Sequence, residues 1–115
     1  MVTTKQLLAK KCMHSETALD DAAIADCLRA VDGWAYADGK IVKQFVFNNY
    51  YETLSFINAI AYVVHAEDHH PELLVTFNRC TVRFDTHSVN GGKGGISDND
   101  FICAAKIDAV YQQSY

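Results

Sequence analysis

Four of the five histidines in this chain lie in one stretch of its second half. His69 and His70 are adjacent and precede Pro71, His65 stands four residues before His69, and His87 follows further along. Histidine exchanges protons near neutral pH without special tuning of its pKa. A small acidic protein that gathers its histidines in this way, with no obvious nucleophile beside them, suits proton transfer or metal binding.

Three interpretations of these histidines compete. In the first, some of them are ordinary surface or capping residues. In the second they bind a metal, since His65 and His69 have the i, i+4 spacing of helical zinc ligands; Glu67, however, does not stand where H-E-x-x-H requires it. The third is metal-free acid–base catalysis, in which one imidazole donates a proton and another accepts one. Because closed zinc sites use clustered thiolates that this chain lacks, we expect no metal.

Length and composition predict a single domain spanning residues 1–115. Half of the residues are hydrophobic and only one is proline, which argues against disorder. Residues 1–14 are basic and weakly patterned, so we expect them to be partly mobile. The net charge of −4, with dispersed lysines and arginines, lacks the signature of a direct nucleic-acid binder. An acidic surface also disfavours anionic membranes, so a neutral small molecule is the expected ligand.

The cysteines and the N-terminus predict a cytoplasmic protein. The chain has no C-x-x-C pair, no signal-peptide pattern and no apolar run of about 18 residues that would suit a membrane span. We therefore expect reduced thiols that behave as small buried hydrophobes. These thiols are Cys12, Cys27, Cys80 and Cys103.

Hydrophobic periodicity predicts the elements that must position the histidines. We expect a helix at about 17–31, strands at 34–37 and 41–47 joined by an Asp38-Gly39 turn, a helix from Asn49 to Pro71, strands at 73–77 and 80–87, and a last helix capped by Ser97 and Asp100. This order, α-β-β-α-β-β-α, predicts an α+β fold: a four-stranded antiparallel sheet with helices packed on one face.

The same patterns predict which side chains face the core. Ile41, Phe45 and Phe47 share one face of their strand, as do Val82 and Phe84, while His87 emerges on the polar face or at the strand end. The second long helix is expected to bury the stripe Leu54, Ile57, Ala61 and Val64, widened by Phe56, Ile60 and Val63. His65 and His69 are expected to share a helix face. The glycine-rich loop 91–95 lacks the phosphate-binding pattern and is expected to be a flexible connection.

The chain resembles the pterin-4a-carbinolamine dehydratases in a set of linked motifs. These are HAEDHHP at 65–71, Phe77, Thr86-His87, and GISDND at 95–100, with Gly33-Trp34 and KQFVF at 43–47 as further blocks. The resemblance covers roughly residues 17 to 112. The linked pattern is specific, whereas H-H-P alone would be weak.

The resemblance implies a fold, an activity and partners. The family has a four-stranded antiparallel sheet under helices, and its members form homodimers or homotetramers. Its enzymes, the 4a-hydroxytetrahydrobiopterin dehydratases, are cofactor-free hydro-lyases that convert 4a-hydroxytetrahydropterin to quinonoid dihydropterin and water. They thereby recycle the by-product of aromatic amino-acid hydroxylation, so the protein is expected to be functionally coupled to an aromatic amino-acid hydroxylase.

The resemblance also implies roles for individual residues. His70 is expected to be the general acid toward the 4a-hydroxyl, His69 the base or polarising partner, and His87 a second acid–base group. The residues expected to bind substrate or support the site are His65, Pro71, Trp34, Thr86 and Asp100. His14 lies outside this group and is expected to have no role.

Two departures from the family pattern and one rival function bear on these expectations. His65 occupies a position that is often glutamate in relatives, and the loop before Asp100 has extra residues around 90–94. The rival is a non-catalytic interaction, assembly or transcriptional coactivator-type protein on the same fold. Retention of all three expected catalytic histidines argues against a purely structural role.

Overall fold

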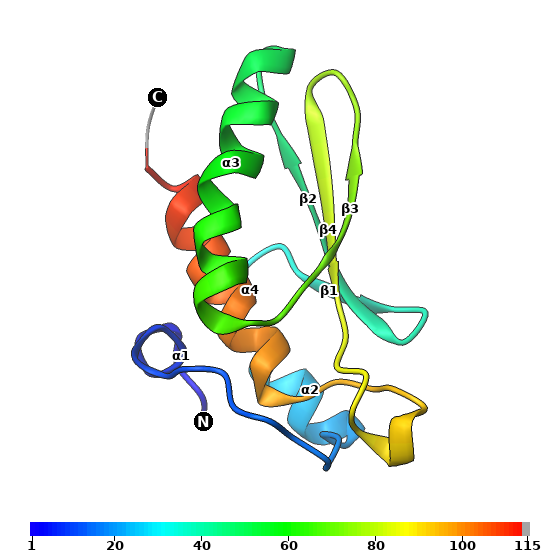
Figure 1. Ribbon diagram of the computed structural model, residues 1–115. Coiled ribbons are helices and arrows are strands. Elements are labelled where there is room, and N and C mark those ends of the chain that lie inside the picture. Colours follow the sequence, from blue (N-terminus) through cyan, green and yellow to red (C-terminus); the bar gives the residue numbers. More distant parts are fainter. Residues whose placement is uncertain (114–115) are drawn as a thin grey trace.

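The chain forms one antiparallel sheet with two long helices on one of its faces (Figure 1). The computed structural model describes residues 1–113. Its elements are α1 (Thr4–Ala9), α2 (Asp21–Leu28), β1 (Ala35–Ala37), β2 (Lys40–Val46), α3 (Tyr50–Glu67), β3 (Glu72–Val75), β4 (Arg79–Phe84), the short 3-10 helix η1 (Asn90–Gly92) and α4 (Asp98–Tyr111). The strands lie in the order β1-β2-β4-β3. This confirms the predicted α+β fold and adds α1 and η1 to it.

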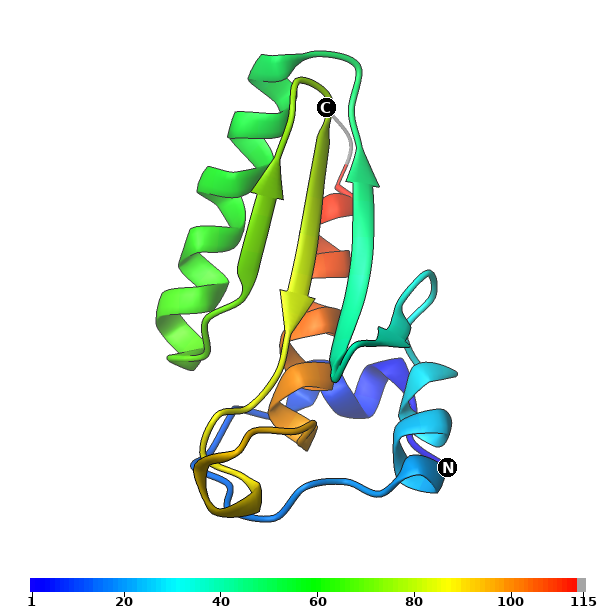
Figure 2. The same ribbon diagram turned by 90° about the vertical axis from the view of Figure 1, so that its right-hand side faces the viewer.

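Helices α3 and α4 pack against each other on the same side of the sheet, which Figure 2 shows from the strand side. The predicted inward faces of β2 and β4 are confirmed. Buried there are Ile41, Phe45, Phe47, Val82 and Phe84, against Phe56 and Ile60 of α3 and Phe101 of α4. Removing these side chains from water is the main favourable term for this packing. The core therefore lies between the sheet and the helix pair.

The turn between β1 and β2 is the two-residue hairpin that Asp38-Gly39 predicts. Both residues have positive φ, 52° and 78°. Positive φ at both central residues is typical of a type I′ turn, whose twist matches that of the flanking strands. The turn sets the register in which Ala37 pairs with Lys40.

The buried face of α3 differs from the predicted stripe. The structure buries Thr53, Phe56, Ile60 and Glu67, whereas Leu54 and Ala61 are exposed and Ile57, Val63 and Val64 are half-buried. Phe56 and Ile60 are buried as predicted, but the stripe from Leu54 to Val64 is not, because apolar residues occur all around this helix and their spacing does not select one face. Thr53 donates from Oγ1 to the carbonyl oxygens of Asn49 and Phe77, and Glu67 pairs with Lys106. These partners let two polar side chains occupy the inner face.

The N-terminal part is more structured than its weak pattern predicted. Residues 4–9 form α1 behind a Thr3 capping box, and Leu7 is buried where α1 packs on α4. The helix expected at 17–31 is shorter, because Asp20 caps α2 and the segment before Asp20 is not helical. Whether residues 1–14 move in solution stays a prediction.

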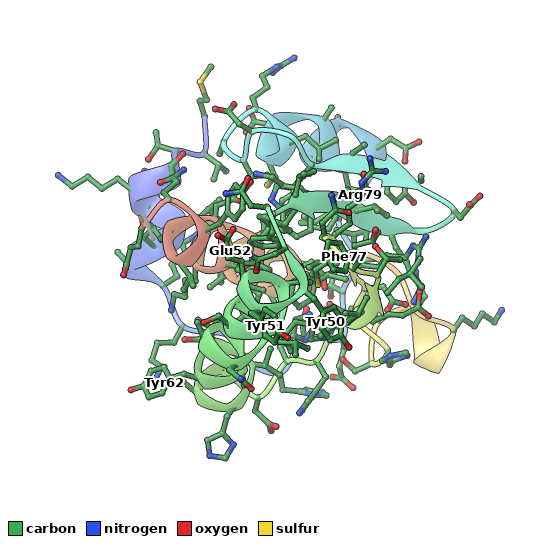
Figure 3. The ribbon with its side chains drawn as sticks, turned by 90° about the horizontal axis from the view of Figure 1, so that it is seen from above. Tyr50, Tyr51, Glu52, Tyr62, Phe77 and Arg79 are labelled. Carbon is green, nitrogen blue, oxygen red and sulfur yellow. The ribbon has the colours of Figure 1, made fainter. Side chains whose placement is uncertain are left out.

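The end of α3 that begins at Tyr50 is rich in aromatic side chains (Figure 3). Tyr50 stacks on Phe77 of the β3–β4 turn, with ring centroids 6.3 Å apart. Beneath them Phe56 lies 4.8 Å from Phe45 and 5.1 Å from Phe47, measured between ring centroids. This end of the molecule is held together mainly by apolar contact.

The four cysteines are free thiols, and three of them are buried. The hydrogen bond with Cys12, 3.6 Å between the sulfur atoms, and burial raise the pKa of Cys103. Cys103 therefore stays protonated at neutral pH, as expected of a packing residue. No helix within residues 1–113 has the length and apolar character to cross a membrane.

Candidate active site

A cavity of about 410 Å³ opens where the C-terminal end of α3 meets the segment after β4. Its lining consists of residues 12–15, 67–70 and 85–88 together with Asn99. The cavity thus brings together His69, His70 and His87, the three histidines to which the family resemblance assigns acid–base roles. It also includes His14, which was not expected to lie near these histidines; whether His14 has a role stays untested.

A left-handed residue at the end of α3 sets the direction of the histidine pair. Asp68 has φ 49° and ψ 45°, and it ends the helix three residues before Pro71. The backbone N–H of His69 still donates to the carbonyl of Val64, at 3.3 Å. The spacing of His65 and His69 predicted that they share a helix face. This prediction is wrong, because His69 lies beyond the end of the helix. His65 is exposed on α3 and does not line the cavity.

A hydrogen bond to Asp100 fixes the side chain of His69. Nε2 of His69 lies 2.6 Å from Oδ1 of Asp100, a carboxylate that is fully buried. Oδ2 of Asp100 accepts from the backbone N–H of Ser97 at 2.9 Å and from Oγ1 of Thr86 at 2.8 Å. An ionised carboxylate only accepts hydrogen bonds, so Nε2 carries the hydrogen and Nδ1 is the nitrogen left free for chemistry.

Thr86 and Ser97 extend this network in one direction. Their hydroxyl oxygens are 2.7 Å apart. Each hydroxyl has one hydrogen, and Thr86 gives its own to Asp100, so Ser97 donates to Thr86. Ser97 also caps α4, as predicted, and accepts from the N–H of Asn99. The start of α4 and the Asp100 carboxylate that accepts from His69 therefore belong to one hydrogen-bonded network.

The ring of His69 is also fixed by stacking. It lies 5.5 Å from the ring of Phe84, centroid to centroid, and the two planes are 6° apart. Trp34 packs behind Phe84 at 6.1 Å, and its indole N–H donates to both carboxylate oxygens of Asp108. Trp34 is buried and does not line the cavity. It supports the stacked pair from the core.

His70 and His87 are held less tightly than His69. His70 is exposed, and the side chain of His87 is 86% exposed, with Nε2 at 3.8 Å from Oδ1 of Asp85. Asp85 also lies 3.4 Å from Nζ of Lys40. Pro71 is half-buried and does not line the cavity. Of these three histidines, His69 is thus fixed, whereas His70 and His87 are exposed to solvent.

The long glycine-rich loop does not displace Asp100. Thr86 and Gly95 form an antiparallel bridge, with N–O distances of 2.7 and 3.2 Å, which closes the loop at its base. Inside it, Nδ2 of Asn90 donates to the carbonyl of Gly94. Extra residues therefore project beyond the bridge, while Ser97 and Asp100 return beside Thr86.

Two acid–lysine pairs join α4 to its surroundings and differ in their pKa shifts. Burial raises the pKa of Glu67, but hydrogen bonds from Lys106 and from the backbone N–H of Cys12 outweigh burial and leave the pKa below its ordinary value. At Asp108 burial prevails over the hydrogen bonds from Lys43 and Trp34, and the pKa is raised. Glu67 is thus a firmly ionised acceptor at the edge of the cavity.

Cation ligands do not gather in this region. Within residues 1–113 no group of three or more histidine, cysteine, aspartate or glutamate side chains has a geometry that would hold a metal ion. The carboxylates near the histidines are instead occupied by hydrogen bonds and lysines. What the arrangement can do chemically is move protons between imidazoles and a bound molecule.

The chain belongs to the pterin 4 alpha carbinolamine dehydratase family, whose model matches residues 17–110. Two bacterial relatives provisionally carry the name pterin-4-alpha-carbinolamine dehydratase. The protein from Bdellovibrio bacteriovorus is 56% identical over 110 residues, 96% of this chain and 92% of the relative. The protein from Nitrosospira multiformis is 45% identical over 113 residues, 96% of each chain.

Solved structures agree with this fold. A crystal structure described as a transcriptional coactivator/pterin dehydratase from Brucella melitensis has a TM-score of 0.75 and 30% identity, covering 83% of this chain and 99% of its own. A pterin dehydratase-like protein, described as a RuBisCO assembly factor in the alpha-carboxysome, has a TM-score of 0.56 and 20% identity, covering 70% and 89%. The second likeness concerns the fold alone.

Sequence reasoning missed several residues of the cavity. Asn99 lies inside the GISDND motif and Ser88 follows Thr86-His87, but neither was given a role, whereas His14 carries no pattern that marks it. Glu67 stood inside the histidine motif but was considered only as a zinc-site glutamate. Its buried pairing with Lys106 is a property of the packed helices.

Proposed function

We propose that the protein dehydrates 4a-hydroxytetrahydropterin to quinonoid dihydropterin and water, as a 4a-hydroxytetrahydrobiopterin dehydratase. The observation that carries this proposal is the joint lining of one cavity by His69, His70 and His87, with His69 oriented by the buried Asp100. Family membership supports dehydratase activity in general terms.

The reaction requires two proton movements. A proton must reach the departing 4a-hydroxyl, and the proton on N5 must leave as the N5 lone pair expels the hydroxyl. His70 is the acid toward the hydroxyl, since it is solvent-exposed and can be reprotonated from water. His69 is the base or polarising partner through Nδ1, because Nε2 is committed to Asp100. His87 is a second acid–base group.

A direct assay tests the proposal. The substrate is generated by a coupled phenylalanine hydroxylase, and its conversion to the quinonoid product is followed with and without this protein. Acceleration that saturates with substrate is the expected result. A dehydration rate equal to the uncatalysed rate at micromolar protein would overturn the enzymatic proposal.

We further propose that the reaction belongs to tetrahydropterin recycling in the cytoplasm, coupled to an aromatic amino-acid hydroxylase and without a cofactor. Proton transfer by positioned imidazoles needs no redox group. Elemental analysis should find no stoichiometric metal, and activity should persist in chelator. One zinc per chain, with activity lost on its removal, would contradict the metal-free mechanism.

A homodimer or homotetramer is the proposed assembly. Strand β3 is an edge strand, and its side chains Leu74 and Val75, on opposite faces of the strand, are 53% and 38% exposed. On α3, Tyr51 and Tyr62 are 80% and 79% exposed. Unpaired strand edges and large exposed apolar patches favour covering by another chain. Light scattering at micromolar concentration should return a multiple of 12.8 kDa.

The exposed apolar surface also favours a second candidate function, that of an interaction or assembly protein. Phe77, at 64% exposure, adds to this surface at the β3–β4 turn. A non-catalytic role would leave cellular function intact when the three catalytic histidines are replaced. Complementation with a His69→Ala, His70→Ala and His87→Ala triple variant separates the two functions.

A further inference from the structure

The segment 12–15 lies between α1 and α2, and all four of its residues line the cavity. It has no regular secondary structure. The family model begins to match only at residue 17, so this segment lies before the region that defines the family. Its place at the cavity therefore needs an explanation from this chain's own contacts.

Buried side chains of the cavity wall hold the first half of the segment. The backbone N–H of Cys12 donates to Oε1 of Glu67 at 2.8 Å. The side-chain amide of Asn99 pairs with the backbone of Met13: Oδ1 accepts from the N–H at 3.0 Å, and Nδ2 donates to the carbonyl at 2.6 Å. Glu67 and Asn99 are 9% and 8% exposed. Bonds from buried groups are costly to break, so they fix the backbone here.

A third wall residue holds the second half. Oγ of Ser88 donates to the carbonyl oxygen of Ser15. His14 thus lies between two fixed points of the backbone, and Glu67, Asn99 and Ser88 all line the cavity themselves. The segment is bonded to the walls of the cavity rather than only packed near it.

The imidazole of His14 differs from that of His69 in its surroundings. His14 is exposed, and the described residues include no hydrogen-bond partner for its ring. His69 has the carboxylate of Asp100 to fix its tautomer. An imidazole without such an orienting group can still donate to, accept from or stack on a heteroaromatic ligand. Because His14 lies outside the region matched by the family model, whereas His69, His70 and His87 lie inside it, we assign the proton transfers to those three and binding to His14.

We propose that residues 12–15 are a substrate-binding strap of the cavity, in which His14 contacts the bound pterin. The inference rests on the proposed function, since it takes the pterin as the ligand. The strap is defined as Cys12, Met13, His14 and Ser15. Glu67, Asn99 and Ser88 are positioning residues that act through it.

Steady-state kinetics of His14→Ala provide the test. Loss of one ligand contact should raise KM by about 3- to 10-fold, and kcat should stay within about twofold of wild type. His14→Gln keeps a side chain that can donate and accept, so it should recover part of the loss. Glu16→Ala is the matched control, because Glu16 is an exposed neighbour that does not line the cavity.

A double-mutant cycle tests the positioning role. Asn99→Ala should also raise KM, because it frees the strap at Met13. Replacing His14 in that background should raise KM by less than it does in the wild type, since the ring is no longer held in place. Full multiplication of the two KM effects would overturn the claim that Asn99 acts through His14. Thermal unfolding and circular dichroism monitor folding.

Binding measured without turnover distinguishes the failures. Calorimetry with biopterin, which has no 4a-hydroxyl to lose, should show a similar weakening for His14→Ala. If the wild type binds and dehydrates while His14→Ala matches it in KM and in biopterin affinity, the strap inference alone fails. If the wild type neither binds biopterin nor dehydrates the substrate, the proposed function fails and the strap inference falls with it.

Discussion

The two ends of α3 are stabilised in different ways. At the Tyr50 end, the ring of Phe56 packs against those of Phe45 and Phe47, with centroids 4.8 and 5.1 Å away, and the hydrophobic effect that favours this packing has no direction. At the Glu67 end, single hydrogen bonds connect Glu67 and Asp100 to groups that line the cavity. Apolar packing tolerates small shifts, whereas each polar bond fixes one atom. The Tyr50 end therefore contributes mainly to folding stability, and the Glu67 end mainly fixes the positions of groups at the cavity.

The largest expected effect is a loss of activity without a loss of stability, in variants of the exposed histidines. His70→Ala and His87→Ala each remove a proton carrier from an exposed position and no part of the core. Each should lower kcat by about 10²- to 10⁴-fold while the circular dichroism spectrum is unchanged. The double variant should lose less than the product of the two effects, because groups that act as a unit are non-additive. Wild-type rates in both single variants would exclude catalysis by these histidines.

A substitution in the aromatic core should have the converse effect and lower stability without lowering kcat. Phe56 is 1% exposed and contacts Phe45 and Phe47. Phe56→Ala should lower the free energy of unfolding by about 3–5 kcal/mol, measured by urea denaturation. Below the unfolding transition, kcat should remain close to wild type. Phe56→Leu, which restores much of the volume, should recover most of the stability; a large fall in kcat with Phe56→Leu would show that the two ends are coupled.

The helix caps allow a matched comparison. Asn49 caps α3 at the aromatic end, and Ser97 caps α4 beside the cavity. Asn49→Ala and Ser97→Ala should each cost about 1 kcal/mol of unfolding free energy. Only Ser97→Ala should also lower kcat, since Ser97 donates to Thr86 and thereby supports Asp100. Equal kcat in both variants would show that the Ser97 cap does not affect catalysis through Thr86 and Asp100.

A smaller effect is expected on the loss of folding stability at low pH. The pKa of Glu67 is lowered in the folded chain, so its contribution to stability is present above its ordinary pKa and is lost as pH falls through the folded pKa. Glu67→Gln should therefore lose less stability than wild type as the pH falls from about 5 to about 3. Asp108, whose pKa is raised, has the opposite sign, so Asp108→Asn should not reduce this acid loss. Urea midpoints across this pH range measure both.

The smallest expected effect is at His65. The side chain is exposed on α3 and lies outside the cavity lining. His65→Glu, which introduces the acidic residue that the family resemblance led us to expect, should change kcat and stability by little, within about 0.5 kcal/mol for stability. A kcat change beyond about threefold, which is roughly 0.7 kcal/mol, would give His65 a part in the chemistry after all.

Local signals explain what could be predicted from sequence. Alternation in β2 and β4, the Asp38-Gly39 turn, the start of α3 at Asn49 and the cap at Ser97 each depend on residues close in the chain, and each is confirmed. Asp68 shows where such signals fail. A left-handed helix end is usually marked by glycine, so an aspartate there gave no reason to end the helix before His69.

Long-range polar contacts explain what could not be predicted. The inner face of α3 depends on Thr53 and Glu67 finding partners elsewhere, and apolar spacing carries no information about them. His14 reaches the cavity because side chains far along the chain bind the backbone on either side of it. A histidine's distance in sequence from the motif was therefore a poor guide to its distance from the site.

The stacking of His69 on Phe84 has a spectroscopic consequence. The two planes are nearly parallel and their centroids are 5.5 Å apart, so the imidazole protons lie close to the ring current of Phe84. Their NMR resonances should therefore be displaced from those of the exposed histidines. His69 thereby carries its own label, and its protonation can be followed by proton NMR in the unmodified protein without isotopic or chemical tagging.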